Sequence, residues 1–202
     1  KLHGFWMSSC ASELSNSGLF IATLVRLISR WLWAIDVKGI ENAPRKGPGV
    51  IVSNHVMYLD PFLIGIFSMT PMSYVASDEL FRKPITRWFF SALGAIPKKR
   101  WSRDIGVLRR MHDVLKRGEL VEIFPEGQRN WDGAPVPVGD EAYRLLMHLG
   151  VPVTCVCLHG GHEAWPRWSR MPARSPMVVE FFPPLNPSDY SDVAEFRREV
   201  ED

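Results

Sequence analysis

Cysteine is scarce in this chain. Three of its 202 residues are cysteines, and Cys155 and Cys157 lie one residue apart in an apolar run, so their side chains share one face of a strand. An odd number of cysteines without a disulfide spacing pattern argues against structural disulfides. It favours reduced thiols in a cytoplasmic setting. His159 and His162 follow, but structural zinc sites separate paired ligands by at least about two residues, so we expect no metal site.

A long uncharged apolar run is also missing. The nearest candidate, residues 18–35, is interrupted by Arg26 and Arg30, which lie four residues apart on one helical face. A membrane span needs about 20 apolar residues without charges, so we expect an amphipathic helix that lies at a membrane interface instead. Trp31 and Trp33 favour this interpretation because indoles prefer the headgroup zone. Docking of the helix on the protein core is the alternative.

The chain has little net charge. The formal value of +2 gives no strong field that would demand a nucleic-acid partner, and we expect none. The charges are unevenly placed, however, with 11 Lys or Arg against two Asp in residues 82–117, and six acids against two Arg in residues 186–202. The basic middle favours an anionic substrate or surface. A solvated helix face followed by an acidic tail is the alternative.

What the chain does contain is an alternation of strand-like and helix-like segments. Strands are predicted at 49–53, 72–77, 95–99, 119–124, 151–160 and 176–182. Helices are predicted at 61–69, 78–94 and 139–150, from Ser188 onward, and after Ser102 with Ile105, Leu108, Met111 and Leu115 on one face. The alternation predicts one α/β domain over residues 36–202, with a twisted central β-sheet flanked by helices. Residues 1–35 form the predicted N-terminal membrane-associating segment.

Two polar side chains follow the apolar run at 49–53. His55 and Asp60 stand five residues apart where this strand ends, and a carboxylate can fix the tautomer of an imidazole that takes a proton from a hydroxyl. The chain has no G-x-S-x-G nucleophile elbow. His55 is therefore predicted to activate a substrate hydroxyl directly. Surface or capping roles for the pair are the alternative.

Two further stretches offer groups for an anion. In FPEGQRN, residues 124–130, Glu126 and Arg129 project from a turn shaped by Gly127, and arginine binds phosphate through a planar fork. In LGAIPKKR, residues 93–100, three consecutive cations end at Arg100. A surface turn with an internal ion pair and a solvated loop are the respective alternatives.

Taken together, four blocks resemble the glycerolipid acyltransferase family, the lysophosphatidic acid acyltransferases and their relatives, over residues 39–184. NHVMYLD resembles the N-H-x-x-x-x-D block, and GAIPKKR resembles a second block through Gly94 and Arg100. FPEGQRN is similar to F-P-E-G-T-R-S, and VPVTCVCL is similar to a fourth, strand-like block. Gln128 and Asn130 replace the usual Thr and Ser of the third block, which leaves the identity of the acceptor open.

The resemblance implies a division of labour. His55 would be the general base and Asp60 its orienting partner, while Arg100, Glu126, Gly127 and Arg129 would bind the substrate. The acyl donor would be acyl-CoA or acyl-ACP as a co-substrate, with no bound cofactor. The acceptor would be a lysophospholipid, with lysophosphatidic acid as the first expectation, and the protein would be peripheral on the cytoplasmic face of the cell membrane.

Three alternatives remain open at this stage. The first is a different acceptor, such as a lyso-ornithine lipid, another lysophospholipid or a glycolipid precursor. The second is a non-catalytic lipid-binding relative, although His55, Asp60 and Glu126 argue against this. A hydrolase that uses Ser53 is the third alternative, and the absence of an elbow argues against it.

Overall fold

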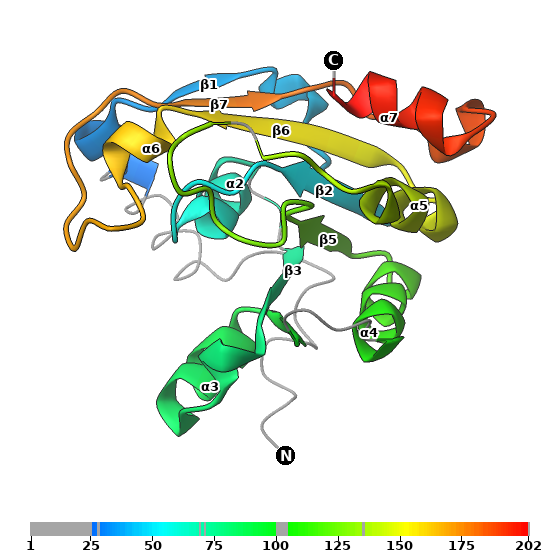
Figure 1. Cartoon of the computed structure of the whole chain (residues 1–202), viewed down its shortest axis with the longest axis horizontal. Coiled ribbons are helices and arrows are strands. Elements are labelled where there is room, and N and C mark those ends of the chain that lie inside the picture. Colours follow the sequence, from blue (N-terminus) through cyan, green and yellow to red (C-terminus); the bar gives the residue numbers. More distant parts are fainter. Residues whose placement is uncertain are drawn as a thin grey trace.

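Seven strands form one sheet at the centre of the molecule. The computed structural model describes residues 26–27, 29–68, 70, 72–99, 105–134 and 136–201. The strand order is β1-β7-β6-β2-β5-β3-β4 (Figure 1). The strands are β1 Asp36–Lys38, β2 Gly49–Ser53, β3 Met72–Ser77, β4 Ile96–Lys98, β5 Leu120–Ile123, β6 Val153–His159 and β7 Val178–Phe181. The predicted α/β domain with a central sheet is confirmed.

Most of the sheet is parallel. β2 pairs with β5 and β6, and β3 pairs with β4 and β5, all in parallel, whereas β7 is antiparallel to β6 and parallel to β1. Every residue of β2 is buried, as expected for a central strand covered on both faces. The carboxyl ends of β2, β5 and β6 consequently meet at one edge of the sheet, which is where α/β folds place their sites.

Helices follow the strands along the chain. The α-helices are α2 Asp60–Ser68, α3 Pro84–Ala92, α4 Ile105–Lys116, α5 Asp140–Leu149, α6 Gly161–Ala164 and α7 Val193–Glu201. Short 3₁₀ turns are η1 Ile40–Asn42, η2 Asp78–Phe81 and η3 Pro187–Asp189. Pro84 opens α3 in its first turn, where proline is favoured, and Gly150 ends α5 in the left-handed conformation with φ 62°.

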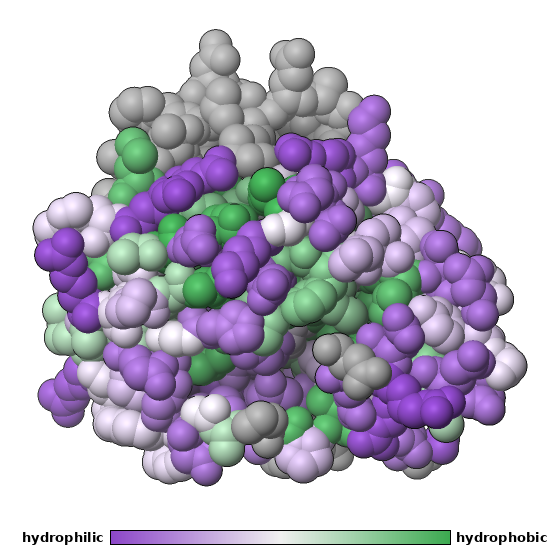
Figure 2. All heavy atoms as spheres, turned by 90° about the horizontal axis from the view of Figure 1, so that it is seen from above, coloured by the Kyte–Doolittle hydropathy of each residue, from purple (hydrophilic) through white to green (hydrophobic). Residues whose placement is uncertain are grey.

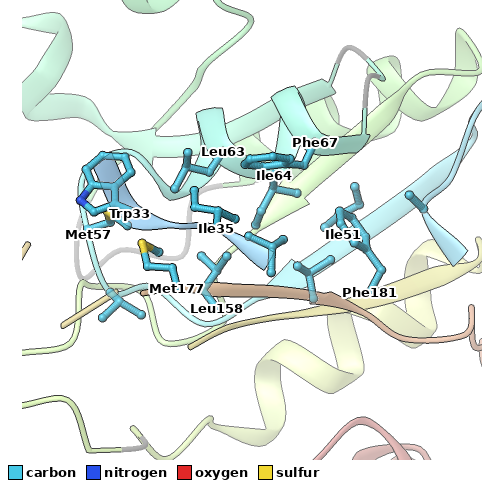
Figure 3. Packing of buried hydrophobic residues seen from close by; sticks show 14 of the residues in the cluster. Trp33, Ile35, Ile51, Met57, Leu63, Ile64, Phe67, Leu158, Met177 and Phe181 are labelled. Atoms are coloured by element: carbon cyan, nitrogen blue, oxygen red, sulfur yellow. The ribbon is translucent and has the colours of Figure 1, made fainter. Parts of the chain in front are cut away.

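The two faces of the sheet carry separate cores. On one face, Ile51 packs with Leu63, Ile64 and Phe67, which project from α2 toward the sheet, as Figure 3 shows. On the other face, α4, α5 and α7 cover the sheet, and their buried side chains pack with Val50 of β2. This alternation along β2 follows from the two-residue period of a strand.

The buried face of α4 is not the apolar stripe by which the sequence predicts this helix. The helix predicted after Ser102 is present, but Ile105 is 66% exposed and Leu108 is 39% exposed, so the apolar stripe that predicts the helix is not its buried face. The buried residues of this helix are Val107, Met111, Val114 and Leu115. Both helical stripes include Met111 and Leu115, so the sequence period alone does not decide between them.

The predicted interfacial helix is only partly described. Residues 26–27 and 29–33 are helical, and the earlier part of the segment lies outside the described residues. Trp31 is 67% exposed, but Trp33 is 3% exposed and its indole Nε1 donates to the carbonyl of Ala173 at 3.1 Å. The prediction that Trp33 lies in a lipid headgroup zone is therefore wrong, because Trp33 and Ile35 belong to the core.

The described surface mixes polar and apolar groups. On the face drawn in Figure 2, hydrophobic residues form several small patches between hydrophilic ones. Large exposed hydrophobic side chains occur on α3 and near residues 131 and 168. Among the residues that the structure describes, no helix has the length and apolarity needed to cross a bilayer.

Candidate active site

His55 and Asp60 form a hydrogen-bonded pair at the carboxyl end of β2. His55 lies just beyond the strand, Asp60 is the first residue of α2, and His55 Nδ1 lies 2.8 Å from Asp60 Oδ2. The same Oδ2 accepts the backbone N–H groups of Val56 at 2.7 Å and Met57 at 2.9 Å. Three donors thus converge on one oxygen of a fully buried carboxylate, which fixes the position of the imidazole.

The other ring nitrogen of His55, Nε2, takes no part in the hydrogen bond to Asp60. With Nδ1–H donated to Asp60, Nε2 carries a lone pair and can accept a proton. The imidazole stacks on the ring of Phe124, with centroids 4.2 Å apart, and its side chain is 20% exposed. The predicted dyad therefore has the geometry of a general base with a fixed tautomer.

Asn54 and Ser53 attach this loop to the sheet. The side chain of Asn54 donates to the carbonyl of Leu158 at 2.9 Å and accepts the N–H of Leu158 at 2.8 Å, which joins β2 to β6. Ser53 is buried, and its hydroxyl donates to the carbonyl of Asn54 at 3.1 Å. Because the Ser53 hydroxyl is engaged with Asn54, it is not arranged as a nucleophile activated by His55.

The FPEG turn brings Glu126 to the dyad. Gly127 adopts φ 69°, a left-handed conformation that favours glycine, and its N–H donates to the carbonyl of Phe124 at 3.0 Å. Glu126 Oε1 accepts the backbone N–H of His55 at 3.1 Å, and the N–H of Asn130 donates to the His55 carbonyl at 2.7 Å. Two blocks about 70 residues apart in sequence, on the parallel neighbours β2 and β5, are thus joined through the backbone of His55.

Arg129 lies over an aromatic ring of the first block. Its guanidinium carbon is 3.3 Å from the ring centroid of Tyr58, a cation–π contact that orients the side chain. Burial lowers the pKa of Arg129, and its buried Nη1 has no hydrogen-bond partner among the described residues. A buried donor without a partner is costly, so this guanidinium is suited to binding an anion.

Carboxyl groups are concentrated beside the dyad. Burial raises the pKa of Asp60, although the hydrogen bonds to His55, Val56 and Met57 oppose this rise. Burial also raises the pKa of Glu126 to about 7, and the negative charge of Asp60 contributes to this shift. The site therefore has a low effective dielectric, in which hydrogen bonds and charges act strongly.

Glu122 is a buried acid that the sequence does not reveal. It lies in β5 in register with Ile51 of β2 and Tyr74 of β3, on the face covered by α2. It is 0% exposed, and neither carboxyl oxygen has a hydrogen-bond partner among the described residues. Burial, followed by the charge of Asp60, raises the pKa of Glu122 well above its ordinary value, so the fold favours the protonated form of this group.

The prediction for Arg100 stays a prediction, and the described cysteine and histidine side chains nearby gather no metal site. Arg100, expected to bind substrate, lies outside the described residues, and Lys98 is exposed at the end of the edge strand β4. Cys157 Sγ lies 4.0 Å from His159 Nδ1, and His162 packs against the ring of Trp168. Within the described part of the chain, no group of three potential metal ligands converges.

Known proteins resemble this chain over the region that contains the His55 loop and the FPEG turn. The Acyltransferase family model matches residues 34–159. A chloroplastic 1-acyl-sn-glycerol-3-phosphate acyltransferase of Brassica napus is 32% identical over 74% of this chain, and one from Pseudomonas aeruginosa is 30% identical over 71%. This chain spans about half the length of these curated relatives, 44% and 57% respectively.

The fold agrees with that of a solved relative. The crystal structure of the 1-acyl-sn-glycerophosphate (LPA) acyltransferase PlsC from Thermotoga maritima superposes with a TM-score of 0.76 and 24% identity, covering 96% of this chain and 81% of that one. The family match includes β2, β5, β6 and every residue of the dyad and the FPEG turn. This chain belongs to the acyltransferase family.

Proposed function

We propose that this protein moves a fatty acyl group from acyl-CoA or acyl-ACP to the free hydroxyl of a lysophospholipid, with lysophosphatidic acid as the first acceptor. One observation carries the proposal: His55 is held by the buried Asp60 with Nε2 left for a hydroxyl, close to Arg129, whose Nη1 has no partner among the described residues. Arg129 lies over the ring of Tyr58, which belongs to the same loop as His55, and a base and a cation at one loop suit an alcohol that carries a phosphate.

The chemistry requires one base and no covalent enzyme intermediate. His55 Nε2 takes the proton of the acceptor hydroxyl while its oxygen attacks the thioester carbonyl. The carbon–sulfur bond of the resulting tetrahedral species then breaks, and the imidazolium returns the proton to the departing thiolate. Asp60 steadies the imidazolium through the 2.8 Å hydrogen bond to Nδ1.

The third block supports binding of the acceptor head group. Arg129 supplies a guanidinium for the phosphate, and Glu126 and Gly127 shape the turn beside His55. The relatives from Brassica napus and Pseudomonas aeruginosa are named 1-acyl-sn-glycerol-3-phosphate acyltransferases, which favours a glycerol-phosphate acceptor here as well. Arg100 remains a further candidate for phosphate contact.

We extend the proposal to a peripheral position on the cytoplasmic face of the membrane. The lipid acceptor and product require access to a bilayer surface. Helix α3 exposes Ile85 at 81%, Trp88 at 67% and Phe89 at 46%, with Arg82 and Lys83 just before the helix. Aromatic side chains beside cations are typical of segments that bind anionic lipid surfaces.

A product assay tests this function. Purified protein is incubated with labelled acyl-CoA or acyl-ACP and a panel of lysolipids, and the products are separated by chromatography. We expect acylation of lysophosphatidic acid by the wild type and none by the His55→Ala variant. Acylation of only an uncharged acceptor, or hydrolysis of the thioester without transfer, would exclude the proposed reaction.

A further inference from the structure

A second arginine is anchored to the catalytic loop. Arg167 lies between α6 and β7, and its Nη1 donates to the backbone carbonyl of Arg129 at 3.3 Å. The N–H of the same peptide unit belongs to Asn130 and donates to the carbonyl of His55 at 2.7 Å. A single peptide unit therefore connects Arg167 with the backbone of the histidine base.

Aromatic side chains fix the guanidinium of Arg167. It lies over the ring of Trp131, with its carbon 5.1 Å from the centroid, and Trp131 packs on Trp168 at 6.0 Å. His162 meets Trp168 edge-on at 5.1 Å, and a Cβ on Gly133 would lie 3.1 Å from the His162 ring. The arginine is thus held before any ligand arrives, which reduces the entropy lost on binding.

The positive charges of Arg129 and Arg167 act on each other. Burial lowers the pKa of Arg129, and the positive charge of Arg167 lowers it further. Tyr58 and the charge of Asp60 oppose this shift in the pKa of Arg129 without cancelling it. Within the described residues, neither guanidinium forms an ion pair with a carboxylate, and Nη1 of Arg129 is buried without a partner. Such a pair of cations beside a catalytic base is suited to an anion of charge greater than one.

We propose that Arg129 and Arg167 together bind a terminal phosphate monoester on the acceptor, which makes Arg167 a specificity-determining residue. This inference rests on the proposed acyl transfer. At pH 7 a phosphate monoester carries about −1.5 to −2 charges, whereas a phosphodiester head group carries one charge and has an oxygen blocked by its substituent. In a lysolipid the phosphate lies a few bonds from the reacting hydroxyl, so cations next to the His55 loop are placed to reach it.

Kinetics with two matched acceptors test the role of Arg167. Lysophosphatidic acid and lysophosphatidylglycerol share the acylated glycerol backbone. The first carries a phosphate monoester and the second a phosphodiester. We expect Arg167→Ala to raise KM for the monoester by roughly 10- to 100-fold and to change KM for the diester little. Arg167→Lys should recover part of the loss, and Arg170→Ala, which alters an exposed arginine of the same loop, should leave both values unchanged.

A binding measurement separates this inference from the proposed reaction. Glycerol 3-phosphate, titrated against the wild type in a calorimeter or by NMR, should bind, and Arg167→Ala should weaken it by a similar factor, with glycerol as the control. Equal loss on both acceptors, or unchanged glycerol 3-phosphate binding in Arg167→Ala, would overturn the role of Arg167. A wild type that binds glycerol 3-phosphate but acylates no lysolipid would instead refute the proposed reaction.

Discussion

Oδ2 of Asp60 lies 2.8 Å from Nδ1 of His55 and is the acceptor for two backbone N–H groups as well. The orienting carboxylate is therefore fixed by its own loop and does not depend on the histidine for its position. This arrangement explains how residues five apart meet: the loop after β2 folds back so that the first residue of α2 supports the imidazole.

Substitutions in the dyad should separate chemistry from folding. His55→Ala removes the base and should lower kcat by roughly 100- to 10,000-fold, with little change in Tm because the imidazole is partly exposed. Asp60→Asn should lower kcat by at least about 100-fold because the imidazole loses its orienting anion. Steady-state kinetics and thermal melts measure both effects. Near-normal turnover by His55→Ala would contradict direct base catalysis.

Glu122→Gln should stabilise the protein at neutral pH. Burial raises the pKa of Glu122 well above its ordinary value of 4.5, so folding favours the protonated carboxyl. The stability that this group contributes is fully present below 4.5 and is lost as pH rises toward the raised pKa. The glutamine side chain cannot titrate, and it preserves the shape of the protonated acid. We expect a rise in Tm at pH 7 of roughly 2–4 °C, the change produced by about 1 kcal/mol in a chain of this size.

Thermal melts of both proteins at several pH values check this expectation. The advantage of the glutamine variant should grow between pH 5 and pH 8 and be small at the acidic end, since both side chains are then neutral. Glu122→Leu is a matched comparison that removes both polar atoms. A lower Tm of Glu122→Gln at pH 8 would mean that Glu122 is ionised and paired in the folded protein.

Glu126 should make the stability of the protein depend on pH between its ordinary pKa of 4.5 and its raised pKa of about 7. Its pKa rises from 4.5 to about 7, so its contribution is fully present below 4.5 and lost as pH rises through about 7. The free energy of unfolding of the wild type should therefore fall as pH rises from 4.5 to about 7, and this fall should be smaller in the Glu126→Gln variant. Urea unfolding at pH 5 and pH 8 measures the difference, and an unchanged pH slope would show that Glu126 titrates normally.

Local patterns in the sequence predict much of this fold. The strands at 49–53 and 72–77 have their predicted bounds because a short apolar run between turns has few other solutions. The dyad was also predictable, since its two residues lie in one short loop. Two short elements were missed, β1 with three residues and α6 with four, because segments of that length carry no periodic signal.

Long-range packing accounts for what the sequence leaves undetermined. Trp33 reads as an interfacial indole, but its partner Ala173 is 140 residues away along the chain. Glu122 has apolar neighbours in its strand, and only the pairing of β5 with β2 and β3 places it in the core. Arg167 likewise contacts Arg129 from a loop after another strand, which no local spacing predicts.

Substitutions in helix α3 test membrane binding better than a deletion of the N-terminal segment 1–35. That deletion would also remove Trp33 and Ile35 from the core, so a loss of binding would not be distinguished from unfolding. Trp88 and Phe89 are exposed on this helix, and inserting such side chains into lipid contributes about 1.5–3 kcal/mol each.

We expect the wild type to float with liposomes that contain anionic lipid, and salt to weaken the binding because Arg82 and Lys83 act electrostatically. The double substitution Trp88→Ser with Phe89→Ser should lower the bound fraction at high salt, where only the apolar contribution remains, by a factor of roughly 10 or more in partition coefficient. Ile105→Ser is the matched control, since Ile105 is 66% exposed but lies on α4. Loss of binding in that control, or a folded wild type that stays at the bottom of the gradient at low salt, would contradict a membrane role for α3.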